Sequence, residues 1–184
     1  DFSGVENSEL AAALFPIWEY RSQTPTLMTH ALDIFLTSPT RSNRTLLESV
    51  AAKIFVRWNQ FLIPPLAKTI LAPSIFGMVA KKEALSRRED LCAVAGQFLE
   101  AILGALSDMP MAVSQTCHSM SMNPRLGVPC VVEFLLALIW VKALEDPESY
   151  SVPSGGGDRA VKKALLMVAD ILGLIAIGAR DKQN

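Results

Sequence analysis

Apolar residues recur every three or four positions between residues 43 and 62, and this spacing is the feature that most constrains the fold. Charged residues (Arg44, Glu48, Lys53 and Arg57) fall off the apolar stripe, as on an amphipathic α-helix with one buried side. No segment alternates apolar and polar residues for long enough to predict a β-strand. The sequence therefore predicts an all-α protein, and the stripe consists of Leu47, Val50, Ala51, Ile54, Phe55, Trp58, Phe61 and Leu62.

Prolines, glycines and capping residues divide the rest of the chain into further helices. Ser86 and Glu89 match a capping box, in which the two side chains bond the first amides of a helix, and Asp158 is a good N-cap. Because proline in a helix interior removes a donor, we expect a helix to end before Pro64 and another to break near Pro73. The predicted helices span 7–21, 24–37, 43–62, an irregular stretch to 82, 87–107, 111–121, 127–145 and 158–180.

The length of 184 residues suits one domain with its own core. The chain begins without Met, so we expect residues 1–184 to form a single helical domain that is a fragment of a longer protein. Pro, Ser and Gly concentrate in residues 146–158, which predicts a flexible loop before the last helix. The run Ser-Gly-Gly-Gly at 154–157 fits either a native loop or an engineered linker.

Apolar residues make up 51% of the chain and charged residues only 19%, which predicts helices covered on more than one side or an apolar face reserved for a partner. The helix over 87–107 has an apolar face opposite a side of small residues, so we expect a second helix to approach that small side closely. The apolar face consists of Leu91, Val94, Ala95, Phe98, Leu99, Ile102 and Leu106, and the small side of Ala93, Gly96, Ala101, Gly104 and Ala105. The last helix is apolar nearly all round although it lies at a chain end. We therefore expect further sequence, a partner or a second copy to cover it.

Seventeen basic residues balance 18 acidic ones, which argues against nucleic acid or an anionic membrane as a partner. Charged residues interrupt every apolar stretch before it reaches the roughly 20 residues of a membrane span, so we expect no membrane segment. The three cysteines (Cys92, Cys117 and Cys130) lie in apolar helical patterns without a CxxC pair. They favour a reducing, intracellular location in the cytoplasm or nucleus.

Three long predicted helices begin near residues 43, 87 and 128, a spacing of roughly 41–44 residues. A shift of 44 residues, from Leu47 to Leu91, superimposes the apolar stripes of the first two helices. A further shift of 41 residues superimposes the stripe of the third helix, Leu135, Leu136, Ile139 and Trp140, on that of the second. This spacing resembles that of armadillo and HEAT repeats over most of residues 24–145. The resemblance implies stacked helix pairs with a groove for a partner and no chemistry of their own. The alternative is an irregular helical bundle with accidental spacing.

Residues with catalytic or metal-binding chemistry do not form a recognisable motif. Cys117 and His118 are neighbours on a predicted helix, where successive side chains point about 100° apart and cannot share a proton. His30 and His118 lack a glutamate three residues earlier, which helical-bundle metal sites use. Asp33, Glu100, Glu133 and Asp170 are isolated acids on apolar helices. We therefore expect no enzyme activity, no metal and no cofactor.

The sequence favours a non-enzymatic scaffold that binds a helix or short linear motif of another protein, with self-association as a possibility. The alternatives are a nucleic-acid-binding helical array that uses basic inter-helix turns, a carrier of a small molecule or lipid, and, last, a bundle enzyme. Basic turns, an aromatic pair near the N-terminus and the last helix supply the candidate contacts. The candidate partner-binding residues are Trp18, Tyr20, Arg41, Arg44, Arg87, Arg88, Leu172 and Ile175.

Overall fold

The computed structural model describes residues 50–80, 87–124, 127–153 and 158–181, and every secondary-structure element in these ranges is helical. The predicted all-α class is therefore confirmed for the described part of the chain. The predicted helices over 7–21 and 24–37 lie outside it. The elements are α3 (Val50–Leu62), α4 (Pro64–Ala80), α5 (Arg88–Gly104), η4 (Leu106–Asp108), α6 (Met111–Met122), α7 (Gly127–Glu133), η5 (Phe134–Val141), α8 (Lys142–Glu145), η6 (Pro147–Tyr150) and α9 (Arg159–Asp181).

Two helices meet at a sharp bend formed by a single residue. α3 ends at Leu62 and α4 begins at Pro64, with an angle of 82° between them. The prolines stop the first helix as predicted, and they also open the second, because proline is well suited to a first helical turn where its missing donor is not needed. The predicted break near Pro73 is wrong: α4 continues through this exposed proline to Ala80.

The centre of the fold is the continuous helical run Gly127–Glu145, which comprises α7, η5 and α8. Its middle third winds as a π-helix, and seven of these eight residues are buried. The Phe134 ring packs edge-on against Phe55 of α3 with ring centroids 4.9 Å apart. Trp58 and Trp140 are 1% and 0% exposed, which confirms both as core residues. The π-turn was not predicted, because a wider turn leaves no clear trace in apolar spacing.

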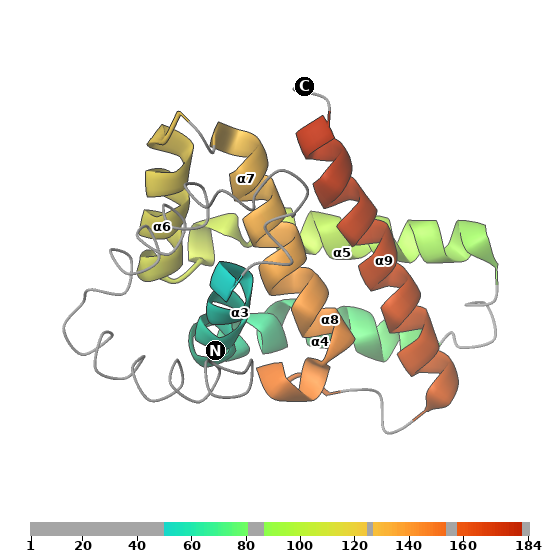
Figure 1. Ribbon diagram of the computed structural model, residues 1–184. Coiled ribbons are helices and arrows are strands. Elements are labelled where there is room, and N and C mark those ends of the chain that lie inside the picture. The colour runs from blue at the N-terminus through green and yellow to red at the C-terminus, as the bar shows by residue number, and fades with distance from the viewer. Residues whose placement is uncertain (1–49, 81–86, 125–126, 154–157, 182–184) are drawn as a thin grey trace, which may run out of the picture.

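Helix α9 packs against the centre of the fold. It contacts α5, α7, η5 and α8, and in Figure 1 it crosses in front of α5 and runs beside the orange α7–α8 run. Although the last helix lies at a chain end, several elements of the same chain cover one side of it. Asp158 caps α9 as predicted: its Oδ1 accepts a hydrogen bond of 2.9 Å from the Ala160 amide.

Helix α5 is buried on one side only. Leu91, Ala95, Phe98 and Ile102 form its core face as predicted. Leu106, predicted on the same face, is 40% exposed because α5 ends at Gly104 and Leu106 lies in η4. The opposite side was expected to lie under a second helix, but Ala93, Gly96 and Gly104 are exposed, and Ala105 is its buried member. Among the described residues, nothing lies within 4 Å of a methyl group added at either glycine. The predicted cover on both sides is therefore wrong. The N-cap is Arg87, whose side chain makes no capping bond, and Ser86 lies outside the described residues.

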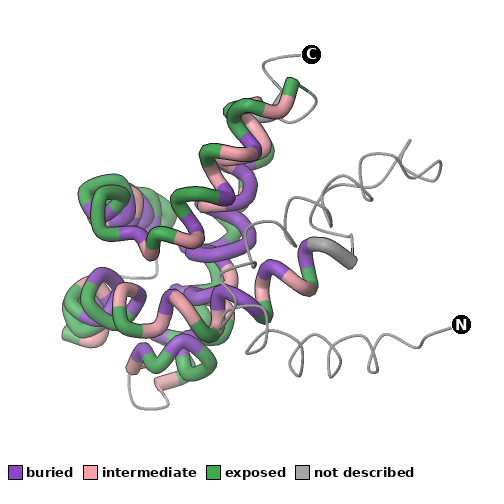
Figure 2. The backbone as a smooth tube through the Cα atoms, turned by 90° about the vertical axis from the view of Figure 1, so that its left-hand side faces the viewer, coloured by how far each residue is buried: buried purple, intermediate pink, exposed green. Residues whose placement is uncertain are grey.

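The stacking expected of an armadillo or HEAT array is not confirmed. In such an array each repeat contacts its sequence neighbours. Here α9 instead contacts α5 as well as α7–α8, and α3 packs on η5 and η6 much later in the chain. The elements form an all-α fold in which buried residues gather where helices meet and exposed residues lie on the outer sides (Figure 2).

The first half of the predicted flexible loop over 146–158 is packed. Pro147–Tyr150 forms a 3₁₀ turn, and Pro147, Tyr150 and Val152 are buried. The loop residues 154–157 lie outside the described residues. The prediction is therefore wrong for the part near η6, because its apolar side chains pack on α4 and α8.

Candidate functional site: the outer side of helix α9

Helix α9 divides sharply along its length into a buried side and an outer side. Val161, Leu165, Val168 and Leu172 are at most 2% exposed and face the rest of the fold. Ile171 is half-buried against the core. Five other large apolar side chains are 40–69% exposed, and they are Leu166, Met167, Leu174, Ile175 and Ile177. The chain thus covers half of this apolar helix and leaves the other half to solvent.

Charged residues on the outer side are confined to specific positions. Arg159, Lys162 and Lys163 are exposed in the first turns, and Asp170 is the sole charged residue between positions 164 and 178. Lys163, Met167, Asp170 and Leu174 follow each other at steps of four, three and four residues, so they lie along one side of the helix. We call the set Arg159, Lys163, Leu166, Met167, Asp170, Leu174 and Ile177 the α9 outer face.

The candidate residues from the sequence are dispersed in the structure. Trp18, Tyr20, Arg41 and Arg44 lie outside the described residues. Leu172 is fully buried, so in this structure it supports the core instead of offering contacts to a partner. Ile175 is 42% exposed although its spacing from Val168 and Leu172 places it on their side of α9, towards the C-terminal end of the helix.

Arg87 and Arg88 are exposed where α5 begins, but they do not create a strongly positive surface. Glu89 and Asp90 follow directly in the first turn of the same helix and offset their charge. A nucleic-acid footprint requires clustered basic residues without such compensation. Within the described residues, the α5 N-terminus therefore offers little support for the nucleic-acid alternative.

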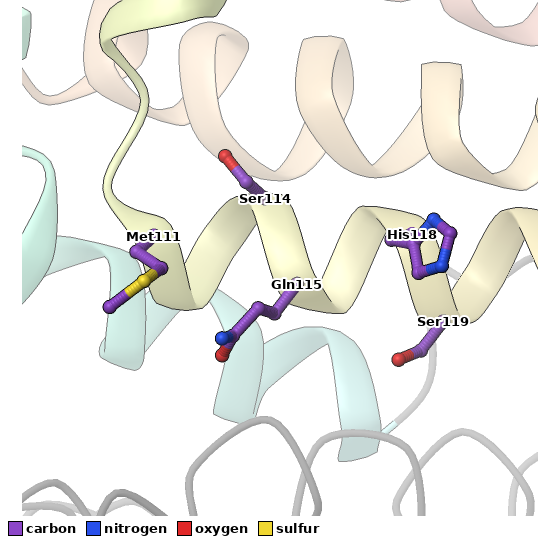
Figure 3. A pocket seen from close by; sticks show the side chains of 5 residues that line it. All are labelled: Met111, Ser114, Gln115, His118 and Ser119. Atoms are coloured by element: carbon purple, nitrogen blue, oxygen red, sulfur yellow. The ribbon is translucent and has the colours of Figure 1, made fainter.

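A shallow hollow of about 490 Å³ lies on α6, lined by Met111, Ser114, Gln115, His118 and Ser119 (Figure 3). All five side chains come from one helix, and none of them is an acid, a lysine or an arginine. No hydrogen bond joins Ser114 to His118 in the described structure, so the hydroxyl lacks the activating base that a nucleophile needs. The five lining side chains therefore do not by themselves identify the hollow as a catalytic site.

Cys117, next to this hollow, is held as a neutral thiol. Burial raises its pKa to about 12, against a smaller lowering effect of a backbone hydrogen bond. A thiol with a raised pKa is a poor nucleophile at neutral pH. Cys92, by contrast, is exposed on α5, so its predicted place in an apolar pattern did not bring burial. Among the described residues, no three His, Cys, Asp or Glu side chains come close enough to hold a metal ion.

Several buried polar atoms lie on elements that contact each other inside the fold. In the described structure the indole nitrogens of Trp58 and Trp140, the Asn59 amide and the Tyr150 hydroxyl have no hydrogen-bond partner. α3 carries two of these residues and packs on η5 and η6, which carry the others. Burial, and the nearby charges of Asp146 and Glu145, raise the pKa of Tyr150 above its usual range. These residues are enclosed by the fold and form no surface for a partner.

The run Gly127–Glu145 is, by length and composition, apolar enough to cross a membrane, and the bent pair α3–α4 passes the same test if taken as one span. The central run was not predicted as a candidate membrane span, because Glu133 and Lys142 interrupt its apolar sequence. The fold buries 61% of that run, however, and Glu133 is itself 1% exposed. Burial against other helices therefore explains the apolar composition of this run equally as well as contact with lipid would.

Neither known protein families nor curated proteins provide a match to this chain.

Proposed function

We propose that the protein is an interaction domain that docks an amphipathic helix of a protein partner on the α9 outer face. The observation that carries the proposal is the exposure of large apolar side chains along the outer side of a helix whose inner side is anchored in the core. Soluble proteins rarely expose contiguous apolar patches larger than a few hundred Å² without a use for them.

The chemistry of the face favours a helical occupant. Its apolar residues recur at helical spacing along one straight element, and a second helix presents matching side chains at i, i+3, i+4 and i+7. Leu174, at 69% exposed, is the most accessible large apolar residue of α9 and offers an anchor for a partner. Asp170 and the basic first turn provide charges that orient the incoming helix.

The proposal needs no repeat stack, since either an armadillo-like array or an irregular bundle would hold α9 rigidly. It also needs no catalytic group. None of the three cysteines forms a disulfide, which is in keeping with a reducing compartment such as the cytoplasm or nucleus. Docking on a rigid helix reduces the ordering cost of binding, because the face is held in place before the partner arrives.

Affinity capture of proteins from cell extract tests the proposal when matched variants are used. Leu174→Glu replaces the most exposed apolar side chain of the docking face by a charged one and should remove specifically bound proteins. Phe76→Glu is the matched control, because Phe76 is an equally accessible apolar residue, 57% exposed, on the separate helix α4. A set of bound proteins that both variants retain, or that both lose, would contradict docking on α9.

A further inference from the structure

We propose that the occupant of the α9 outer face is α9 of a second copy of this chain, docked antiparallel with Lys163 opposite Asp170 of the other copy. This inference rests on the proposed function, because it takes the α9 outer face to be a docking surface. It adds the identity of the partner, the direction of its helix and the register of the contact.

The first observation is that two charges of opposite sign lie on the docking face without partners. Lys163 and Asp170 are exposed, and within the described residues neither takes part in an ion pair or a hydrogen bond. They lie seven positions apart along α9, about 10.5 Å at the helical rise, which is too far for a direct contact within one helix. Each charge is therefore available to a residue outside its own copy.

The second observation is the symmetry of the sequence about the middle of the face. Lys163 lies three positions before Leu166, and Asp170 lies three positions after Met167. A two-fold axis between Leu166 and Met167 therefore places each Lys163 opposite the other copy's Asp170. The same arrangement brings Leu166 and Met167 together at the centre and sets Leu174 over the aliphatic stem of Arg159.

The charges disfavour the competing arrangements. A parallel pair would place the basic first turns of Arg159, Lys162 and Lys163 side by side, and like charges at close range repel. An antiparallel pair centred on Asp170 would oppose two carboxylates. A register centred between Ala164 and Leu165 would pair Arg159 with the other copy's Asp170, but both residues at that centre are buried within their own copy. The register centred between Leu166 and Met167 gives two ion pairs of opposite sign around an exposed apolar centre. An unrelated partner would have to provide this pattern, whereas a second copy already carries it.

The size of the contact sets the expected strength. One helix on each side buries less than the standard interface of about 1,600 Å². We therefore expect a reversible dimer with a dissociation constant in the micromolar range instead of an obligate one. Because the two ion pairs are exposed at the rim, salt should weaken the dimer moderately.

Analytical ultracentrifugation of the full chain tests the inference with a charge swap. We expect the wild type to dimerise, and Lys163→Asp and Asp170→Lys each to raise the dissociation constant at least about tenfold, since each opposes like charges twice. The double variant Lys163→Asp with Asp170→Lys restores the opposite signs and should return the constant to within about threefold of wild type. Circular dichroism of each variant verifies the fold, and all changed side chains are exposed.

Three results would overturn the inference: a wild type that stays monomeric at the highest soluble concentration, single variants that dimerise as well as wild type, or a double variant that stays as weak as the singles. A monomeric wild type would leave the capture experiment with Leu174→Glu and Phe76→Glu intact. The failure of self-docking and the failure of docking on α9 are thus separate outcomes.

Discussion

The run Gly127–Glu145 and helix α9 are the two most apolar segments of the described chain, and the fold treats them differently. The first lies at the centre, with every residue from Ala137 to Val141 buried. The second has one side in the core and large apolar residues such as Leu174 in solvent. The difference comes from the packing of each segment. α3, α6 and α9 all contact the central run, whereas α9 is buried only along its inner side among the described residues.

This comparison shows that apolar content alone does not locate a helix. The same excess of apolar residues serves as a core in one segment and as an available surface in the other. Only the positions of neighbouring helices separate the two cases. For α9, the exposed outer face is the basis of the docking proposal.

The largest expected effect comes from a charge placed in each segment. Leu138 is 1% exposed in the π-turn, so Leu138→Glu buries a charge without a designed partner and should cost several kcal/mol, enough to approach the whole stability of a domain. Leu174→Glu should change stability by less than about 1 kcal/mol. Chemical denaturation followed by circular dichroism measures both. Similar losses for the two variants would remove the contrast between the segments.

A second test compares two leucines on α9 itself. Leu172→Ala removes a fully buried side chain and should destabilise by about 2–5 kcal/mol, through lost burial and a residual cavity. Leu174→Ala, two positions later, should cost less than about 0.5 kcal/mol because the side chain is largely in solvent. Unfolding midpoints in urea report the difference. Equal shifts would show that the division of α9 into inner and outer sides is wrong.

These leucines also show how much the sequence could predict. Helical spacing identified the class of the fold and core residues such as Phe98 and Trp58. Spacing tells which residues share a side, but not what lies opposite that side. It therefore placed Leu172 among the partner contacts although it is buried, and it placed Phe61 in the core although it is 54% exposed, beside Arg57.

The spacing that defines the α9 outer face was readable in the sequence, but its accessibility was not. Nothing local distinguishes Lys163 or Asp170 from an ordinary solvated charge, and their relation emerges only once the inner side of α9 is known. The buried Asn59 was missed for a similar reason, since amides on helices usually face water. Tertiary contacts decide such positions.

Two cysteines extend the comparison of inner and outer positions to reactivity. Cys117 has a pKa of about 12 because of burial, so the fold favours its neutral thiol. The preference of the fold for the neutral Cys117 thiol contributes a stability that is fully present below about pH 9 and is lost as the pH rises towards about 12. Urea denaturation at pH 8 and pH 11 should therefore show a smaller loss of unfolding free energy for Cys117→Ala than for wild type.

The two cysteines should also differ in their rates of alkylation. At pH 8 the exposed Cys92 should be labelled faster than Cys117. Equal rates would contradict the burial of Cys117.

The smallest expected effect contrasts one glycine from each segment. Gly173 lies within α9, and a methyl group added there meets nothing within 4 Å. Gly173→Ala should therefore stabilise the protein by about 0.5–1 kcal/mol, since alanine loses less entropy in a helix.

Gly127, at the start of the central run, has a φ of +64°, which L-residues adopt only with strain. Gly127→Ala should therefore destabilise by about 1–2 kcal/mol although space for the methyl exists. Thermal unfolding of the two variants should move the midpoint in opposite directions. A loss of stability for Gly173→Ala would mean that part of the chain lies over the outer side of α9 in solution, and the docking face would then be closed. A gain, with the dimerisation constant unchanged, would show that this side is open and that Gly173 lies beside the contact instead of within it.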